Sequence, residues 1–271
     1  MIVLTFANHK GGTGKTTSAI CVSAALGMSG HRVLVIDLDP QCFLTRMLGV
    51  SEPIEGTSSL SLYDPQSRLT NETTRHFSWF DLLPASSKAP RFLRKLSKAT
   101  DVLWVRESIR KADLDYDVII IDTAAAVTAY SLSALVAGDL AVIPVAPEYQ
   151  SVVGGEQSFR TIETVRSRLN PDLEPGRFLL TQVDARKKTH HNFRAYLRDK
   201  YGDLVLRSIV RTSASLSHAY EDGSTVFDHS SGSRGAVDYA NVTDELIMAM
   251  NLPSTEPGMT GAGRPQPNVV D

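Results

Sequence analysis

Apolar residues come in short unbroken runs that alternate with longer stretches in which apolar and polar positions are mixed. Each run predicts a β-strand, and the runs occupy residues 2–7, 32–37, 77–83, 118–122, 140–145, 178–183 and 204–210. Because these strands lack polar alternation, both of their faces should be buried, which is typical of a parallel sheet between two layers of helices. The helical patterns that supply these layers cover residues 14–28, 131–137, 155–169, 190–200 and 236–250. The sequence thus predicts a doubly wound α/β fold, with ligands at the carboxyl ends of the strands.

Two segments do not fit this alternation. Residues 51–71 are rich in Ser, Thr, Pro and Gly, which indicates a loop with short helical turns. Residues 251–271 contain four prolines and show no helical periodicity, so we expect a disordered tail. The chain is therefore predicted to form a single domain over residues 1–250, followed by that tail.

Composition adds limits to this picture. The chain has 28 Lys and Arg against 30 Asp and Glu, so its overall charge does not predict a nucleic-acid partner. Any such partner must be inferred from local clusters. Cys21 and Cys42 form no CxxC pair and are expected to be reduced thiols. We expect no signal peptide, because Met1 leads directly into an apolar strand, and no run approaches the roughly 20 apolar residues of a membrane span. We expect a soluble, cytoplasmic protein.

A glycine-rich loop joins the first predicted strand to the first predicted helix. Its residues are Lys10, Gly11, Gly12, Thr13, Gly14, Lys15, Thr16 and Thr17. Backbone N–H groups of such a loop, together with the helix N-terminus, form a concave anion site, and glycines permit the unusual φ angles. Lys15 can bridge the β- and γ-phosphates of a nucleotide, and the Thr16 hydroxyl can ligate Mg²⁺. The sequence therefore predicts a nucleotide-binding P-loop.

The loop departs from the common pattern G-x-x-x-x-G-K-[ST], because His9 replaces the first glycine and Lys10 adds a second lysine. In this form it resembles the deviant Walker A motif of the ParA/MinD family of P-loop ATPases, and ParA-type (Soj-like) partition ATPases in particular. Three further segments match this family in order and spacing: residues 37–41, 118–122 and 208–239. The resemblance covers residues 1–250 and implies the P-loop NTPase fold and Mg²⁺-dependent hydrolysis of ATP to ADP and phosphate.

The resemblance also implies roles for individual residues. Lys10 would reach across the interface of an ATP-bound homodimer to the other subunit's ATP, where a cation stabilises charge on the transferring γ-phosphoryl group. Asp39 would orient the attacking water, although a simple turn remains an alternative for this position. Asp122 would hold Mg²⁺ directly or through water. Asp37 would lie just outside the metal's ligands or satisfy backbone groups.

The resemblance places two further sites late in the chain. Gln182 and Asp184 follow a strand end that lies near the adenine base in this family. Family members bind DNA non-specifically when they are ATP-bound and dimeric. A basic stretch suits contacts with phosphates and contains the candidates Arg186, Lys187, Lys188, Arg194, Arg198 and Arg211. The alternative for this stretch is an ordinary solvated helix face.

Four functions remain open from the sequence. The first is a nucleoid-associated partition ATPase that positions a plasmid, a chromosome or another large cargo, with hydrolysis stimulated by a ParB-like or cargo-adaptor protein. The second is a MinD-like membrane-associated ATPase, but the C-terminal prolines interrupt the amphipathic helix that it would need. The third, a relative of the nitrogenase iron protein, needs cluster-binding cysteines, and Cys21 and Cys42 lie at the wrong places. The fourth is a nucleotide-dependent binding module without turnover. We expect no membrane partner.

Overall fold

The computed structural model describes residues 1–94, 96 and 98–253 of the chain. Eight strands form one sheet in the order β3-β4-β2-β5-β1-β6-β7-β8. Their bounds are β1 (Ile2–Phe6), β2 (Val33–Asp37), β3 (Arg75–His76), β4 (Asp81–Leu83), β5 (Val118–Asp122), β6 (Leu140–Val145), β7 (Arg177–Val183) and β8 (Val205–Arg211). Every neighbouring pair is parallel except β3–β4. The predicted α/β fold is confirmed, whereas residues 254–271, for which a disordered tail is expected, lie outside the described residues.

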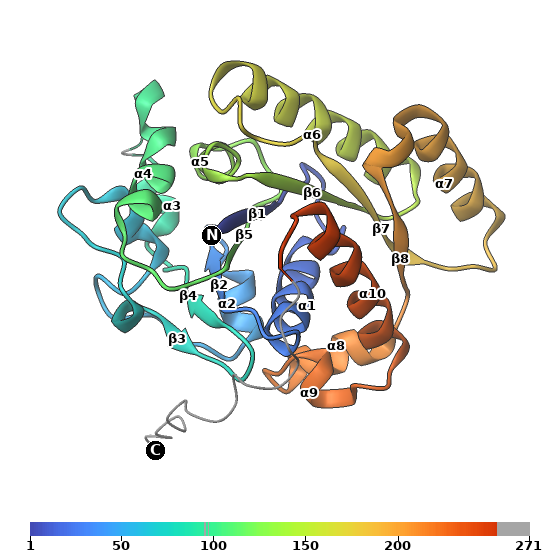
Figure 1. Cartoon of the computed structure of the whole chain (residues 1–271), viewed down its shortest axis with the longest axis horizontal. Helices are drawn as coiled ribbons and strands as arrows, with labels where there is room; N and C mark the ends of the chain where they lie inside the picture. Colours follow the sequence, from blue (N-terminus) through green and yellow to red (C-terminus); the bar gives the residue numbers. More distant parts are fainter. Residues whose placement is uncertain (95, 97, 254–271) are drawn as a thin grey trace.

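Helices cover both faces of the sheet (Figure 1). One layer holds α1 (Lys15–Met28), α2 (Phe43–Met47), α8 (Ala214–Glu221), α9 (Val226–Ser230) and α10 (Arg234–Ala249). The other holds α3 (Ala89–Leu93), α4 (Trp104–Lys111), α5 (Ala129–Ala137), α6 (Tyr149–Arg168) and α7 (Lys188–Tyr201). Four short 3₁₀ helices complete the described chain: η1 (Ser59–Tyr63), η2 (Asn71–Thr73), η3 (Ala99–Leu103) and η4 (Gly202–Leu204).

The core follows from the alternation of side chains along the strands. In β1, Leu4 packs in the cluster under α1 and α10, while its neighbour Val3 packs in the cluster under α4 and α5. In β5, Ile120 and Ile119 divide in the same way. Successive residues of a strand point to opposite faces, so a strand covered on both sides must be apolar throughout. The unbroken apolar runs are therefore a direct consequence of the two helical layers.

The prediction of one strand over residues 77–83 is wrong. β4 begins only at Asp81, and a turn separates it from β3, with the N–H of Phe77 donating to the carbonyl of Phe80 at 2.9 Å. The carbonyl of Trp79, in this turn, packs so closely on α1 that a Cβ at Gly27 would lie 1.9 Å from it. Packing against α1 thus bends an apolar stretch that would otherwise suit a continuous strand.

The parallel arrangement brings several loops to one edge of the sheet. The segments that follow β1, β2, β5, β6 and β7 all leave from carboxyl ends of parallel strands. Ligands of open α/β sheets bind at this edge. Cys21 and Cys42 are both free and buried.

Candidate nucleotide-binding site

The P-loop connects β1 to α1 at the carboxyl edge of the sheet. Its strand, β1, pairs with β5 on one side and β6 on the other, so the loop lies near the middle of that edge. Gly12 and Gly14 have φ angles of 74° and 83°, values that favour glycine. No side chain caps the N-terminus of α1, which begins at Lys15. The first N–H groups of the helix are therefore left for a ligand, and an anion suits them.

Side chains hold three P-loop carbonyls by hydrogen bonds. The ammonium of Lys15 donates to the carbonyl of Lys10 at 3.1 Å. The amide of Gln182 donates to the carbonyl of Gly12 at 2.7 Å, and the hydroxyl of Thr181 donates to the carbonyl of Thr13 at 2.8 Å. In a planar trans peptide the C=O and N–H groups point in opposite directions. Fixing these carbonyls therefore turns the following N–H groups to the other side. The loop is shaped as a row of donors for an anion.

Three aspartates lie beside the P-loop. Asp37 ends β2 and Asp122 ends β5, and the two are partners in the sheet register. Asp39 lies two residues after Asp37 in the chain. All three are buried, since Asp37 and Asp122 are 0% exposed and Asp39 is 7% exposed. Burial raises the pKa of each carboxyl group, to about 6 for Asp37. The nearby ammonium of Lys15 acts against this rise at Asp39 and Asp122, while burial lowers its own pKa.

Asp122 has no well-formed hydrogen bond to either carboxylate oxygen within the described chain. Burial, and next the neighbouring Asp37, raise its pKa well above the usual range, while the hydroxyl of Thr16 acts in the opposite direction. A buried carboxylate without a partner is unfavourable. A nearby cation, or a water molecule bound to that cation, would compensate the buried negative charge. Hydroxyl and carboxylate oxygens are ligands that Mg²⁺ prefers. The residues present therefore fit a magnesium ion.

The protein alone supplies few ligands for such an ion. Among the described residues, no group of three or more His, Cys, Asp or Glu side chains could hold a metal. Mg²⁺ keeps several waters and is usually bound by one or two protein groups together with substrate phosphates. The site therefore suits a metal that arrives with a nucleotide.

Asp37 and Asp39 organise the loop that follows β2. One oxygen of Asp37 accepts from the N–H and the hydroxyl of Thr45 at 3.0 and 2.7 Å, and the other accepts from the N–H of Asp39 at 3.0 Å. Asp37 thus satisfies backbone groups, which is one of the two roles expected for it. Oδ1 of Asp39 accepts from the N–H of Gln41 at 2.8 Å. For Oδ2 we find no such bond within the described residues, which leaves it able to accept from a water.

Lys10 is exposed, in contrast to the buried Lys15 of the same loop. Its backbone N–H donates to Oδ1 of Asn8 at 2.9 Å. Gly154 of α6 lies against it, since a Cβ at position 154 would be 2.8 Å from the Cβ of Lys10. Beside Lys10, the P-loop and the start of α6 line a pocket of about 300 Å³. The Lys10 side chain therefore lies at the rim of the site, where a second molecule could meet it.

Comparison with known proteins agrees with this geometry. AAA_31, a family described as AAA domain, matches residues 1–175. The chromosome-partitioning ATPase Soj of Thermus thermophilus is 34% identical over 244 residues, which cover 90% of this chain and 94% of that relative. The chain belongs to the ParA/MinD-type family of P-loop ATPases. The chromosome partitioning protein ParA of Myxococcus xanthus is 30% identical over 249 residues, or 90% of this chain and 87% of the relative.

Solved structures of similar fold include two that hold nucleotide. Cobyrinic acid a,c-diamide synthase from Mycobacterium smegmatis, with bound ADP and magnesium, has a TM-score of 0.76 and 28% identity, covering 95% of this chain and 100% of that one. A plasmid partition protein from Borrelia burgdorferi bound to AMPPNP has a TM-score of 0.76 and 22% identity over 92% and 99%, which supports the fold alone. In the described parts of the chain, no helix has both the length and the apolar character needed to cross a bilayer.

In this ParA/MinD-type ATPase, the two residues predicted near the adenine base are already engaged with protein groups. Gln182 donates to the carbonyl of Gly12, as described above. Asp184 accepts from Arg186 through both carboxylate oxygens at 3.0 Å, and Arg186 lowers the pKa of that carboxyl group. Both lie at the carboxyl end of β7, beside the P-loop. Contact with a base stays a prediction.

The predicted basic surface is found in part. Lys187, Lys188 and Arg198 are exposed on α7 and on the residues that precede it, as is Arg186. Arg194 is half-buried, and its Nε is buried without a hydrogen-bond partner in the described chain. Four exposed cations thus remain on this side of the molecule, with Arg194 partly withdrawn from the surface.

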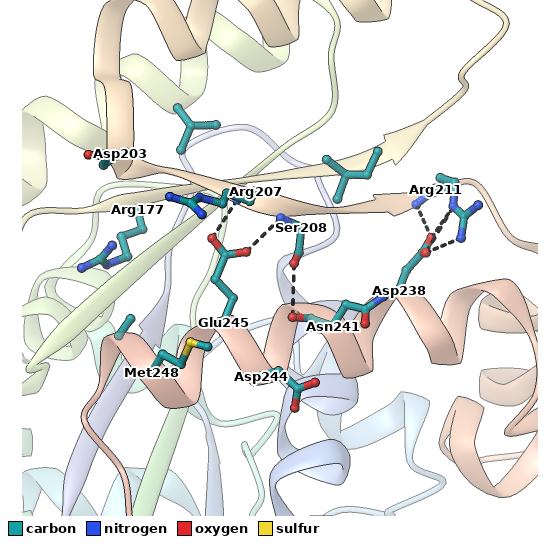
Figure 2. Close-up of a pocket in the computed structure, with 13 residues that line it drawn as sticks. Arg177, Asp203, Arg207, Ser208, Arg211, Asp238, Asn241, Asp244, Glu245 and Met248 are labelled. Carbon is teal, nitrogen blue, oxygen red and sulfur yellow. Dashed lines mark hydrogen bonds and ion pairs between the residues drawn. The ribbon is translucent and has the colours of Figure 1, made fainter.

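Arg211 departs from this prediction. It lies on β8 and faces α10, where it donates to both carboxylate oxygens of the buried Asp238 at 2.5–3.1 Å (Figure 2). Its backbone N–H also donates to Asp238. The charge of Arg211 is therefore compensated by Asp238, as that of Arg186 is by Asp184, and contact of either residue with DNA stays a prediction. Asp238 and Glu245 together cover the outer edge of β8, since Glu245 accepts from two further N–H groups of that strand at 2.7 and 2.8 Å.

Reasoning from sequence missed several residues that shape the site. Thr181 holds the P-loop, and Ser158 of α6 accepts from the N–H of His9 at 2.8 Å. Asn8 fixes Lys10 and donates to the carbonyl of Pro144 at 2.6 Å. Polar residues next to the ends of apolar strands are the one signal that could have indicated Asn8 and Thr181. For Ser158, within a long helix, the sequence offers no such signal.

Proposed function

We propose that the chain is a ParA-type ATPase that binds ATP and Mg²⁺, hydrolyses ATP as a homodimer, and positions a large cargo on DNA. One observation carries the proposal: two lysines of the same loop lie in opposite environments. Lys15 is buried and feels the charges of Asp39 and Asp122, while Lys10 is exposed at the rim. This arrangement suits one lysine that acts within its own subunit and another that acts in a neighbouring one.

The chemistry follows from the positions of the side chains. The P-loop N–H groups and Lys15 bind the phosphates. Thr16, and Asp122 directly or through water, would hold Mg²⁺, which would supply positive charge to offset that of the phosphates. Asp39 accepts a hydrogen bond from the attacking water and thereby orients it towards the γ-phosphate. Lys10 from the second subunit stabilises the negative charge that develops during transfer.

Exposed apolar side chains around the site support pairing of two subunits. Phe43, Val127 and Tyr149 are 53%, 54% and 73% exposed. They follow β2, β5 and β6, so they lie on loops or helix starts at the same edge of the sheet as the P-loop. Large apolar side chains at a surface that also presents Lys10 are favourable contacts for a second copy.

The remaining features concern the partners. Exposed cations on and before α7, namely Arg186, Lys187, Lys188 and Arg198, would contact DNA phosphates without reading bases. Arg194 adds to them as far as it is exposed. A ParB-like or cargo-adaptor protein would stimulate hydrolysis and release the dimer from DNA. The protein would then act in the cytoplasm in association with the nucleoid.

Retention of the protein on DNA tests this proposal. Wild type and Lys15→Ala are compared on DNA-coated beads with Mg²⁺ and ATP, with ADP, or without nucleotide. We expect retention of the wild type with ATP only, and none for Lys15→Ala in any state. Equal retention of the wild type in all three states, or none with ATP, would reject the proposed mode of action.

The M. smegmatis neighbour favours a second candidate, an ATP-dependent synthase of the same fold. Such an enzyme would use ATP without any response to DNA. ATP turnover by the wild type, combined with no retention on DNA in any state, would therefore support this candidate. A MinD-like role on membranes would instead be marked by ATP-dependent binding to anionic vesicles.

A further inference from the structure

Gln182 adopts a backbone conformation that is unusual for a residue with a side chain. Its φ is 53°, in the left-handed region, where such residues persist when the surroundings hold them. The surroundings here are the P-loop, because its amide donates to the carbonyl of Gly12 at 2.7 Å. Gly12 itself has a φ of 74°. One side-chain hydrogen bond therefore joins two unusual backbone positions, one in the nucleotide loop and one at the end of β7.

The segment after Gln182 leads into α7 through a folded turn. The N–H of Asp184 donates to Nδ1 of His190, in the first turn of α7, at 3.1 Å. His190 is buried. Arg186 closes the same turn by its ion pair with Asp184. A rotation of the backbone at Gln182 would therefore move the start of α7.

The far end of α7 is held by α6. One oxygen of Glu156 accepts from the hydroxyl of Tyr196 at 2.8 Å, the ammonium of Lys200 at 2.7 Å and the hydroxyl of Tyr201 at 3.2 Å. The C-terminal end of α7 is thus held by α6 and does not depend on the hydrogen bond between Gln182 and the P-loop. Movement at the near end would turn α7 about its attachment to Glu156.

We propose that Gln182 is a positioning residue that couples occupancy of the P-loop to the position of α7. Phosphates on the loop fix the Gly12 peptide, and this favours the conformer in which Gln182 is left-handed and α7 is held. This conformer is the one that the structure shows. With a less constrained Gly12 peptide, Gln182 would visit an ordinary φ more often, and the start of α7 would be held less tightly. The statement that α7 binds DNA rests on the proposed function. The coupling between the P-loop and α7 is a property of the chain itself and can be measured without DNA.

Amide hydrogen exchange over residues 184–201 tests the coupling directly. Wild type and Gln182→Gly are compared with saturating ATP, with saturating ADP and without nucleotide, and nucleotide binding is verified by calorimetry. Glycine adopts left-handed φ values readily, so the variant loses the side chain and keeps the backbone. We expect ATP to slow exchange in this segment of the wild type by about fivefold or more, a typical coupling. In Gln182→Gly the difference between the nucleotide states should be lost.

Two control variants separate coupling from general loosening. Glu156→Gln weakens the attachment of α7 to α6 and leaves Gln182 intact. It should raise exchange at residues 196–201 in every state and keep the effect of ATP at residues 184–190. Gln157→Ala changes an exposed side chain of α6, for which the structure records no hydrogen bond among the residues it describes. It should behave as the wild type.

Three outcomes would overturn the proposal. One is a full response to ATP in Gln182→Gly, and another is no response in the wild type. The third is loss of the response at residues 184–190 in Glu156→Gln, which would place the connection in α6. DNA retention then distinguishes this proposal from the proposed function. Coupled exchange without any DNA retention rejects DNA binding alone. ATP-dependent DNA retention of the wild type, together with a full exchange response to ATP in Gln182→Gly, rejects the coupling alone.

Discussion

Gly154 of α6 lies so close to Lys10 that no side chain fits between them, since a Cβ at position 154 would be 2.8 Å from the Cβ of Lys10. The exposed lysine of the P-loop is thus placed by a helix that follows it in the chain by more than a hundred residues. This contact explains how a flexible, glycine-rich loop can present a lysine in one defined position.

Gly154→Ala should displace Lys10 and impair hydrolysis more than binding. Lys15 and the helix N-terminus are not touched, so we expect ATP affinity to stay near that of the wild type. A displacement of a catalytic group by about 1 Å can reduce turnover by up to roughly 100-fold. Steady-state ATPase rates and calorimetric affinities measure the two effects. Gly232→Ala is the matched control, because a Cβ there meets nothing within 4 Å. Equal rates for the two variants would contradict this role of Gly154.

Asp39→Ala should bind ATP and slow its hydrolysis. The carboxylate that would orient the water is lost, and removal of such a group typically lowers the rate by about 10²–10⁴-fold. The variant should remain on DNA after a chase with ADP, because the ATP-bound dimer persists. Single-turnover hydrolysis and the time course of release measure this. If Asp39→Ala hydrolyses ATP at the wild-type rate, Asp39 does not orient the water and its role is confined to the turn at Gln41.

Asp122→Asn should stabilise the protein without ligand, and more so at high pH. Burial raises the folded-state pKa of Asp122, so the wild type loses stability as the pH rises from the ordinary value of about 4 through the raised value. The neutral variant avoids this loss, and we expect a gain of about 1–3 kcal/mol at pH 8 and a smaller gain at pH 5.

Thermal melts at both pH values, with and without Mg²⁺ and ADP, measure this difference. The variant should also lose most of the stabilisation that Mg²⁺ adds to that of the nucleotide. The exposed Asp113→Asn is the control and should change neither quantity. A less stable Asp122→Asn at pH 8 would show that the carboxylate has a partner that we have not identified.

Lys188→Glu combined with Arg198→Glu should weaken DNA retention and spare ATP turnover. Both side chains are exposed on α7, away from the P-loop carbonyls and the aspartates of the site. Each lost phosphate contact should reduce the slope of log affinity against log salt by about one. Arg160→Glu with Arg168→Glu, on the exposed face of α6, provides the same change of charge as a control. Unchanged retention and salt slope would return α7 to an ordinary solvated helix.

Much of the fold and part of the site could be predicted from the sequence. The bounds of β5 agree with the predicted strand, and α1 begins directly after the predicted glycine. Such features depend on runs of apolar residues and on short motifs, and both are local signals. The start of α6 could not be predicted in this way. Gly154 and Gly155 lie inside it, and glycine lowers helix propensity. They are needed because Cβ atoms there would lie 2.8 Å from Lys10 and 2.6 Å from Val145.

By itself, the sequence determined the fold class, the P-loop and the strands that end at Asp37 and Asp122, because each depends on neighbours within a few positions along the chain. Only the tertiary structure decided which polar side chains are free to meet a ligand. Gln182 is bonded to Gly12, 170 residues away, and Arg211 is bonded to Asp238, 27 residues away. No local pattern encodes such pairs, because they arise only when packing brings distant strands and helices together.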